Sequence, residues 1–249
     1  MKIVRFKYQK NIFWGKLGND TVSAFGDYPW NSKLKSKKIP LKGVSLLAPY
    51  DGGKVILAGL NYKDHAREMK MPTPKEPIIF LKPPTAVTGP DTKIVYPAQS
   101  KNLHYEAELA FIVGKTAKNI KPADSAKYIL GYTCLNDVTA RDLQTKDGQW
   151  TRAKGFDTFC PLGPWIETAY DWRHKAIKLC LNGGVRQAST TDNFIFDPHY
   201  LLAFISSVMT LYPGDVVSTG TPPGVGPMLS GDCVEVTIEG LGALTNKVT

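Results

Sequence analysis

Short apolar runs separated by turn residues make up the first 48 residues of the chain. The pieces "KIVRFKY", "NIFWGKLG" and "DTVSAFG" are rich in Val, Ile, Phe and Tyr, with Gly, Asn or Asp between them. Runs of this kind are typical of strands joined by turns. Residues 1–48 are therefore predicted to form a small N-terminal β domain. The turn-rich "APYDGGK" at 48–54 then leads into a larger domain over residues 49–249.

The larger domain is predicted to be mostly β with a few helices, an α+β fold without the regular strand–helix alternation of a Rossmann or barrel enzyme. Segment 61–77 joins the helix-like "NYKDHAREM" to "PTPKEP", which predicts a short helix between loops, a candidate mobile lid. Other predicted elements are strands at 54–60, 105–115 and 132–139, a hairpin at 176–187 and a helix at 122–131. A further helix is predicted to begin at the cap Asp197 and to end at Pro213. Its apolar stripe consists of Leu201, Phe204, Ile205, Val208 and Met209.

Composition and charge exclude several classes of protein. Apolar residues make up 43% of the 249, enough for a sizeable core. No run approaches the ~18 apolar residues of a membrane helix, and lysines interrupt the N-terminal apolar residues, so neither a membrane span nor a signal peptide is predicted. We therefore expect a cytoplasmic protein with reduced, buried cysteines. The net charge of +9 is scattered apart from "KLKSKK" at 33–38, which predicts a solvated surface and no nucleic-acid binding.

Two glutamates precede the most apolar strand, in "YEAELAFIVGK" at 105–115. Because side chains alternate along a strand, Glu106 and Glu108 must face the same way. A solvent-exposed strand edge would explain this pair equally well. Asp137, in the strand-like "LNDVT", supplies a third carboxylate in apolar surroundings. Three carboxylates suit a hard divalent cation, so the sequence indicates a Mg²⁺ site, for which Mn²⁺ or Ca²⁺ would also serve.

Several other polar residues are candidates for chemistry, each with an ordinary surface position as the alternative. His65 and Glu68 lie three apart in "DHARE", so that on a helix the carboxylate would orient the imidazole as a general base. Arg141 and Gln144 follow Asp137 and could bind a substrate carboxylate. Lys154 could stabilise a developing oxyanion or enolate. Thr221, in the glycine-rich "STGTPPGVGPM", could donate its hydroxyl.

Seven motifs follow one another along the chain: "GLNYKDHAREM", "FLKPPTAVTGP", "LHYEAELAFIVGK", "GYTCLNDVTARDLQ", "KGFDTFCPLGPW", "LNGGVRQ" and "STGTPPGVGPMLSGDCVEV". Together and in this order, they resemble the motifs of the fumarylacetoacetate hydrolase family, in its acylpyruvase and 2-hydroxyhepta-2,4-diene-1,7-dioate isomerase branch. The resemblance covers roughly residues 50–249.

The resemblance implies a mixed β-roll with a few helices and a homodimer. It implies Glu106, Glu108 and Asp137 as metal ligands and His65 with Glu68 as the lid dyad. Lys154 is implied as a catalytic residue, and Arg141, Gln144 and Thr221 as substrate ligands.

The implied partner is a small anionic 2-oxo acid that reacts through a metal-bound enolate. Hydrolysis of a C–C bond in an acylpyruvate or fumarylpyruvate is the first expectation. Oxaloacetate-type decarboxylation and isomerisation of a 2-hydroxy-dienoate are alternatives on the same site. The last alternative is a non-catalytic binding module. The presence of the proposed metal ligands and of the His65–Glu68 pair argues against it.

Overall fold

The computed structural model describes residues 1–31 and 34–249, and the side chains of residues 34–37 are also outside the description. Most of the predicted solvated lysine cluster at 33–38 therefore lies outside the described residues. Within the described part, the largest sheet has twelve strands. Its hydrogen-bonded order is β4 (Leu34–Pro40), β3 (Thr21–Phe25), β2 (Asn11–Leu17), β1 (Lys2–Tyr8), β14 (Cys160–Glu167), β12 (Ile129–Asn136), β11 (Ala107–Val113), β17 (Val216–Ser218), β6 (Val55–Ala58) and β7 (Ile79–Lys82), with β5 (Val44–Leu47) on β1 and β8 (Val87–Thr88) on β14.

A second sheet packs against the centre of the first and encloses the main core. Its order is β16 (Gly184–Thr190), β15 (Ala176–Leu181), β19 (Cys233–Ile238), β20 (Gly242–Val248) and β9 (Lys93–Ile94). Leu109 and Phe111 of β11 meet Leu179 of β15 and Val236 of β19 in one buried cluster. A smaller sheet carries β13 (Thr139–Ala140), β10 (Leu103–Tyr105) and β18 (Gly226–Met228). The fold is therefore mostly β.

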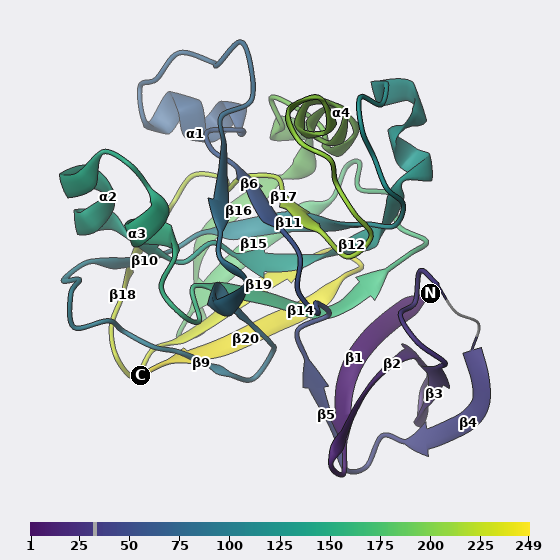
Figure 1. Cartoon of the computed structure of the whole chain (residues 1–249). Coiled ribbons are helices and arrows are strands. Elements are labelled where there is room, and N and C mark those ends of the chain that lie inside the picture. The colour runs from purple at the N-terminus through teal and green to yellow at the C-terminus, as the bar shows by residue number, and fades with distance from the viewer. Residues whose placement is uncertain (32–33) are drawn as a thin grey trace.

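The N-terminal strands continue the large sheet at one side of the molecule (Figure 1). Strands β1, β2 and β3 match the three predicted pieces, and Val4, Phe6, Val22 and Ile39 form their own small core. Strand β1 pairs with β14 through Ile3 and Ile166, which joins this unit to the rest of the chain. Such pairing between distant segments leaves no local signal in the sequence.

The helices are short and lie around the sheets (Figure 1). They are α1 (Lys63–Glu68), α2 (Arg141–Asp147), α3 (Thr151–Lys154), α4 (Pro198–Val208), and the 3₁₀ turns η1 (Pro84–Ala86), η2 (Pro122–Lys127) and η3 (Thr191–Asn193). Asp197 caps α4 by accepting a hydrogen bond from the Tyr200 amide, as predicted. In the part of the chain that the structure describes, no helix has the length and apolar character needed to cross a membrane.

Three local predictions were wrong. The helix predicted at 122–131 is the short 3₁₀ turn η2, because Ile129 already begins β12. Helix α4 ends at Val208, which is 55% exposed and so is not part of the buried stripe. Cys134 and Cys160 are buried, but Cys180 is half-buried and Cys233 is exposed, at the start of an alternating strand whose buried positions begin with Val234.

Candidate active site and metal centre

Three buried carboxylates meet where β11 pairs with β12. Glu108 lies on β11, Glu106 directly precedes that strand, and Asp137 directly follows β12. The antiparallel register sets Glu108 opposite Leu135, and the Asp137 amide donates to the Glu106 carbonyl at 2.9 Å. Each carboxylate offers an oxygen within 4.8 Å of the other two. The structure therefore brings together the three residues predicted as metal ligands.

Two buried lysines flank Asp137. Lys154 Nζ, from α3, lies 2.5 Å from Asp137 Oδ2 and 3.0 Å from Glu106 Oε2. Burial lowers the pKa of Lys154, but Asp137 and Glu106 outweigh it and raise that pKa above its ordinary value. Lys82 Nζ, from β7, lies 2.8 Å from Asp137 Oδ1, and burial lowers the pKa of Lys82. Both ammonium groups offset the charge of the carboxylate cluster.

Two backbone carbonyls hold Lys82 beside Asp137. Lys82 donates to the carbonyls of Val138 and Phe159, at 2.9 and 2.6 Å. Its remaining close contact is the ion pair with the buried Asp137 Oδ1 at 2.8 Å. The ammonium group therefore neutralises this carboxylate inside the site.

Arg141 and Gln144 extend the site from the first turn of α2. Arg141 donates to Glu106 Oε1 through Nη2 and to Gln144 Oε1, at 2.6 Å, through Nη1. Burial raises the pKa of Glu106, but Lys154 and Arg141 together lower it to about 2. His104 accepts from Arg141 Nε at 3.4 Å, and burial together with the Arg141 charge lowers the pKa of His104 to about 4. Glu106 is therefore ionised and His104 neutral at neutral pH.

The glycine-rich loop after β17 holds the other glutamate. Ser218 Oγ donates to Glu108 Oε2, and the Gly220 amide donates to the same oxygen at 3.0 Å. Thr221 Oγ1 donates to the Ala107 carbonyl at 2.9 Å. Burial, followed by the charges of Asp137 and Glu106, raises the pKa of Glu108 well above its ordinary value. A bound cation would relieve this repulsion, so the all-oxygen set of Glu106, Glu108 and Asp137 fits a hard divalent metal.

His65 and Glu68 form the predicted pair on α1. His65 Nδ1 lies 2.8 Å from Glu68 Oε2, and the Gly224 amide donates to the other oxygen of Glu68 at 3.0 Å. The helix is also fixed at its start, where Asp64 Oδ2 accepts from Ser189 and Asn193. These contacts hold α1 against β16, η3 and the glycine-rich loop.

A cavity of about 230 Å³ contains the site. Every predicted site residue except Glu68 lines it, and Glu68 reaches it through His65. The other lining side chains are apolar and include Met69, Phe80 and Trp150. The cavity therefore has one charged, metal-binding end and one apolar end.

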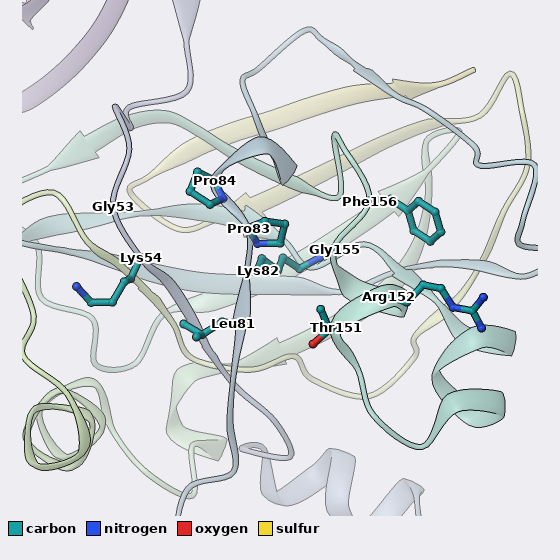
Figure 2. A pocket seen from close by; sticks show the side chains of 10 residues that line it. All are labelled: Gly53, Lys54, Leu81, Lys82, Pro83, Pro84, Thr151, Arg152, Gly155 and Phe156. Atoms are coloured by element: carbon teal, nitrogen blue, oxygen red, sulfur yellow. The ribbon is translucent and has the colours of Figure 1, made fainter.

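A larger cavity, of about 740 Å³, lies beside β7 and lacks carboxylates in its lining. Figure 2 shows Lys54 and Arg152 on opposite sides of it, each with its charged end directed away. Lys54 instead pairs with Asp215, and Arg152 with Asp147. Because no carboxylate lines it, this cavity lacks the acidic ligands that the smaller cavity offers a metal.

Two functional neighbours of the site escaped the sequence predictions. Lys82 is a charged residue within the apolar "IIFLK" at 78–82, a position that signals a buried partner. Gln187 lies on β16, accepts from the Ala107 amide at 2.9 Å and donates to Thr221 Oγ1 at 2.9 Å. Gln187 thus connects the glutamate strand to the glycine-rich loop. Gln187 ends the motif "LNGGVRQ", but its neighbours on the strand are mostly exposed, so the local pattern did not mark it as a buried residue of the site.

Comparison with known protein families shows to which family the chain belongs. Residues 54–249 match the model described as fumarylacetoacetate (FAA) hydrolase C-terminal. The chain belongs to the fumarylacetoacetate hydrolase family. Residues 1–49 match a second family, described as Rv2993c-like, N-terminal.

Relatives within this family carry several different activities in their names. The structure of a 5-carboxymethyl-2-hydroxymuconate delta-isomerase from Mycobacterium smegmatis is 44% identical, with a TM-score of 0.95 over 100% of this chain and 99% of that one. Oxaloacetate tautomerase Fahd2a, mitochondrial, of Rattus norvegicus is 43% identical over 84% of this chain and 71% of its own. Fumarylpyruvate hydrolase from Pseudomonas aeruginosa, in complex with Mn²⁺ and pyruvate, is 33% identical with a TM-score of 0.77, covering 86% and 92%.

Proposed function

We propose that the chain is a divalent-metal-dependent enzyme that converts small 2-oxo acids through their enolates. The observation that supports it most is the meeting of Glu106, Glu108 and Asp137 in one cavity with Lys154 and the His65–Glu68 pair. A binding module would need no such dyad beside a metal centre. Membership of a family of enzymes that act on related acids supports the same class of reaction.

The charges of the site favour an anionic substrate. Three carboxylates face three cationic side chains, those of Lys82, Lys154 and Arg141, so these groups nearly balance without a metal. Glu106, Glu108 and Asp137 would hold Mg²⁺, with Mn²⁺ or Ca²⁺ as alternatives. When bound, such a cation would supply a Lewis acid for the 2-oxo carboxylate. The resulting excess of positive charge would suit a substrate that carries one charge and gains another as the enolate forms.

The chain's own polar groups would position that substrate. Arg141 and Gln144, which now hydrogen-bond to each other at 2.6 Å, would donate to substrate oxygens. Thr221, which lines the cavity from the glycine-rich loop, would contribute its hydroxyl. Lys154, buried and charged, would donate to the oxygen on which the enolate charge develops. Closure of α1 over the cavity would exclude bulk water.

The first reaction we propose is hydrolysis of an acylpyruvate. His65, oriented by Glu68, would take a proton from water, and the resulting hydroxide oxygen would bond to the acyl carbonyl carbon. The C–C bond to C3 would then break, its electron pair forming the pyruvate enolate. Protonation at C3 would complete the products, a carboxylic acid and pyruvate.

The second candidate is a reaction in which the enolate is protonated without attack by water. The relatives named as an isomerase and a tautomerase are 43–44% identical to this chain, against 33% for the named hydrolase. The same residues would serve, with proton transfer between carbon and oxygen as the only change. Loss of CO₂ from an oxaloacetate-type acid would generate the same enolate. The predicted homodimer remains a proposal.

A substrate panel tests the proposed function. Acylpyruvates, fumarylpyruvate, oxaloacetate and 2-hydroxy-dienoates would be incubated with the purified chain, with and without Mg²⁺ or Mn²⁺. We expect turnover of at least one of them, dependent on the metal and abolished by a chelator. Hydrolysis would release pyruvate and an acid, whereas tautomerisation would change only the enol absorbance. The absence of metal-dependent turnover across the panel would refute the proposal.

A further inference from the structure

The end of the cavity away from the carboxylates is apolar and open. Met69, Met71 and Ile78 line it and are 52%, 49% and 45% exposed, so they belong to the small set of large apolar side chains that face solvent. All three lie on the segment between α1 and β7. Exposed apolar side chains gathered at the mouth of a cavity indicate a binding surface. Methionines suit such a surface, because their flexible side chains adapt to different shapes.

An aromatic pair continues this surface toward the charged end. The rings of Phe80 and Trp150 pack edge to face, with centroids 5.2 Å apart. Lys154 Nζ lies 5.0 Å from the centre of the Phe80 ring. The apolar wall therefore begins beside the reacting end of the substrate and runs out to the methionines at the mouth.

The two permanently cationic side chains that line the cavity, Arg141 and Lys154, both contact Glu106 and so lie at the carboxylate end. Lys70 stands between the two methionines in the sequence, but it does not line the cavity. A second carboxylate at the far end of a substrate would thus leave water for an apolar wall without a counter-charge, which is unfavourable.

We infer that the site selects 2-oxo acids whose far end is uncharged and apolar, and that Met69, Met71 and Ile78 bind this end. The inference rests on the proposed function and names the substrate class of the same site. Acylpyruvates with alkyl or aryl acyl groups belong to this class. Fumarylpyruvate and the hepta-2,4-diene-1,7-dioates do not, because each carries a second carboxylate at its far end.

Binding of unbranched 2-oxo acids tests the inference without any turnover. Titration calorimetry with Mg²⁺ present would compare 2-oxobutanoate, 2-oxopentanoate, 2-oxohexanoate and 2-oxoadipate. We expect the affinity to rise about fourfold for each added CH₂ along the first three. 2-Oxoadipate, with the chain length of 2-oxohexanoate and a second carboxylate, is expected to bind at least about tenfold more weakly.

A matched pair of variants then locates the apolar end. Met71→Lys places a cation at the mouth and is expected to improve binding of 2-oxoadipate relative to 2-oxohexanoate by about tenfold. Leu229→Lys makes the same change at a residue that is 67% exposed and outside the cavity, and should leave the ratio as it is.

Each outcome of these titrations has a defined meaning. Equal or tighter binding of 2-oxoadipate by the unaltered chain would overturn the inference. The inference would also be overturned if the chain turned over a member of the substrate panel but bound neither six-carbon acid. In that case the proposed function would still stand. Failure of all four acids to bind, with no turnover in the panel, would overturn both.

Discussion

A Glu108→Gln variant is expected to bind Mg²⁺ or Mn²⁺ at least ~100-fold more weakly than the unaltered chain, since loss of even an outer partner of a metal ligand costs about 10- to 100-fold. Glutamine keeps the shape of the side chain, and its oxygen can still accept from Ser218 and Gly220. Only the carboxylate, one of the three proposed anionic ligands, is lost. Titration calorimetry of the metal-free protein measures the change.

The same variant should fold at least as well as the unaltered chain without metal. Burial and the charges of Asp137 and Glu106 disfavour the carboxylate of Glu108, and a neutral amide removes that cost. We expect the free energy of unfolding in urea to stay within about 1 kcal/mol or to rise. Glu76→Gln, at an exposed position outside the cavity, is the control for both measurements. Unchanged metal affinity in Glu108→Gln would show that Glu108 is not a ligand.

A His65→Ala variant should retain its metal affinity and lose most of its hydrolytic activity. His65 lines the cavity, but it belongs to α1, and its imidazole forms its ion pair with Glu68 and not with the carboxylate cluster in the described structure. Loss of a positioned general base lowers kcat by about 10²- to 10⁴-fold. Calorimetry with Mg²⁺ and a steady-state assay on whichever acylpyruvate the panel identifies would measure the two effects.

His174→Ala is the matched control for this prediction. His174 is exposed, pairs with Asp192 and lies outside the cavity, so its removal should leave kcat and metal affinity as they are. Hydrolysis by His65→Ala at a rate close to that of the unaltered chain would exclude His65 as the base. A parallel loss of metal binding would instead indicate that α1 supports the whole site.

Local periodicity predicted the part of the site that depends on neighbouring residues. The spacing of Glu106 and Glu108 predicted that both face the same way, and their carboxylates do meet, although Glu106 lies just outside β11. The i,i+3 spacing likewise brought His65 to Glu68. These relations follow from the geometry of one strand or one helical turn.

The contacts between distant segments could not be predicted in the same way. Lys82 lies at the end of β7 and reaches Asp137, which follows the distant strand β12. The Arg141 contact with Glu106 depends on how α2 packs against β10 and β13. The pairing of β1 with β14 likewise joins two segments of the twelve-stranded sheet that lie far apart in the chain. Sequence periodicity within one element carries no information about its distant partner.

Formation of an enolate at the metal centre is the central claim, and hydrogen exchange at C3 of pyruvate tests it most directly. The proposed hydrolysis ends with protonation of the pyruvate enolate at C3, so its reverse would wash deuterium into the methyl group. Pyruvate would be followed in D₂O by proton NMR with the protein and Mg²⁺. We predict exchange that needs both components, stops when a chelator is added and is lost in Glu108→Gln. Exchange no faster than with Mg²⁺ alone would contradict the account.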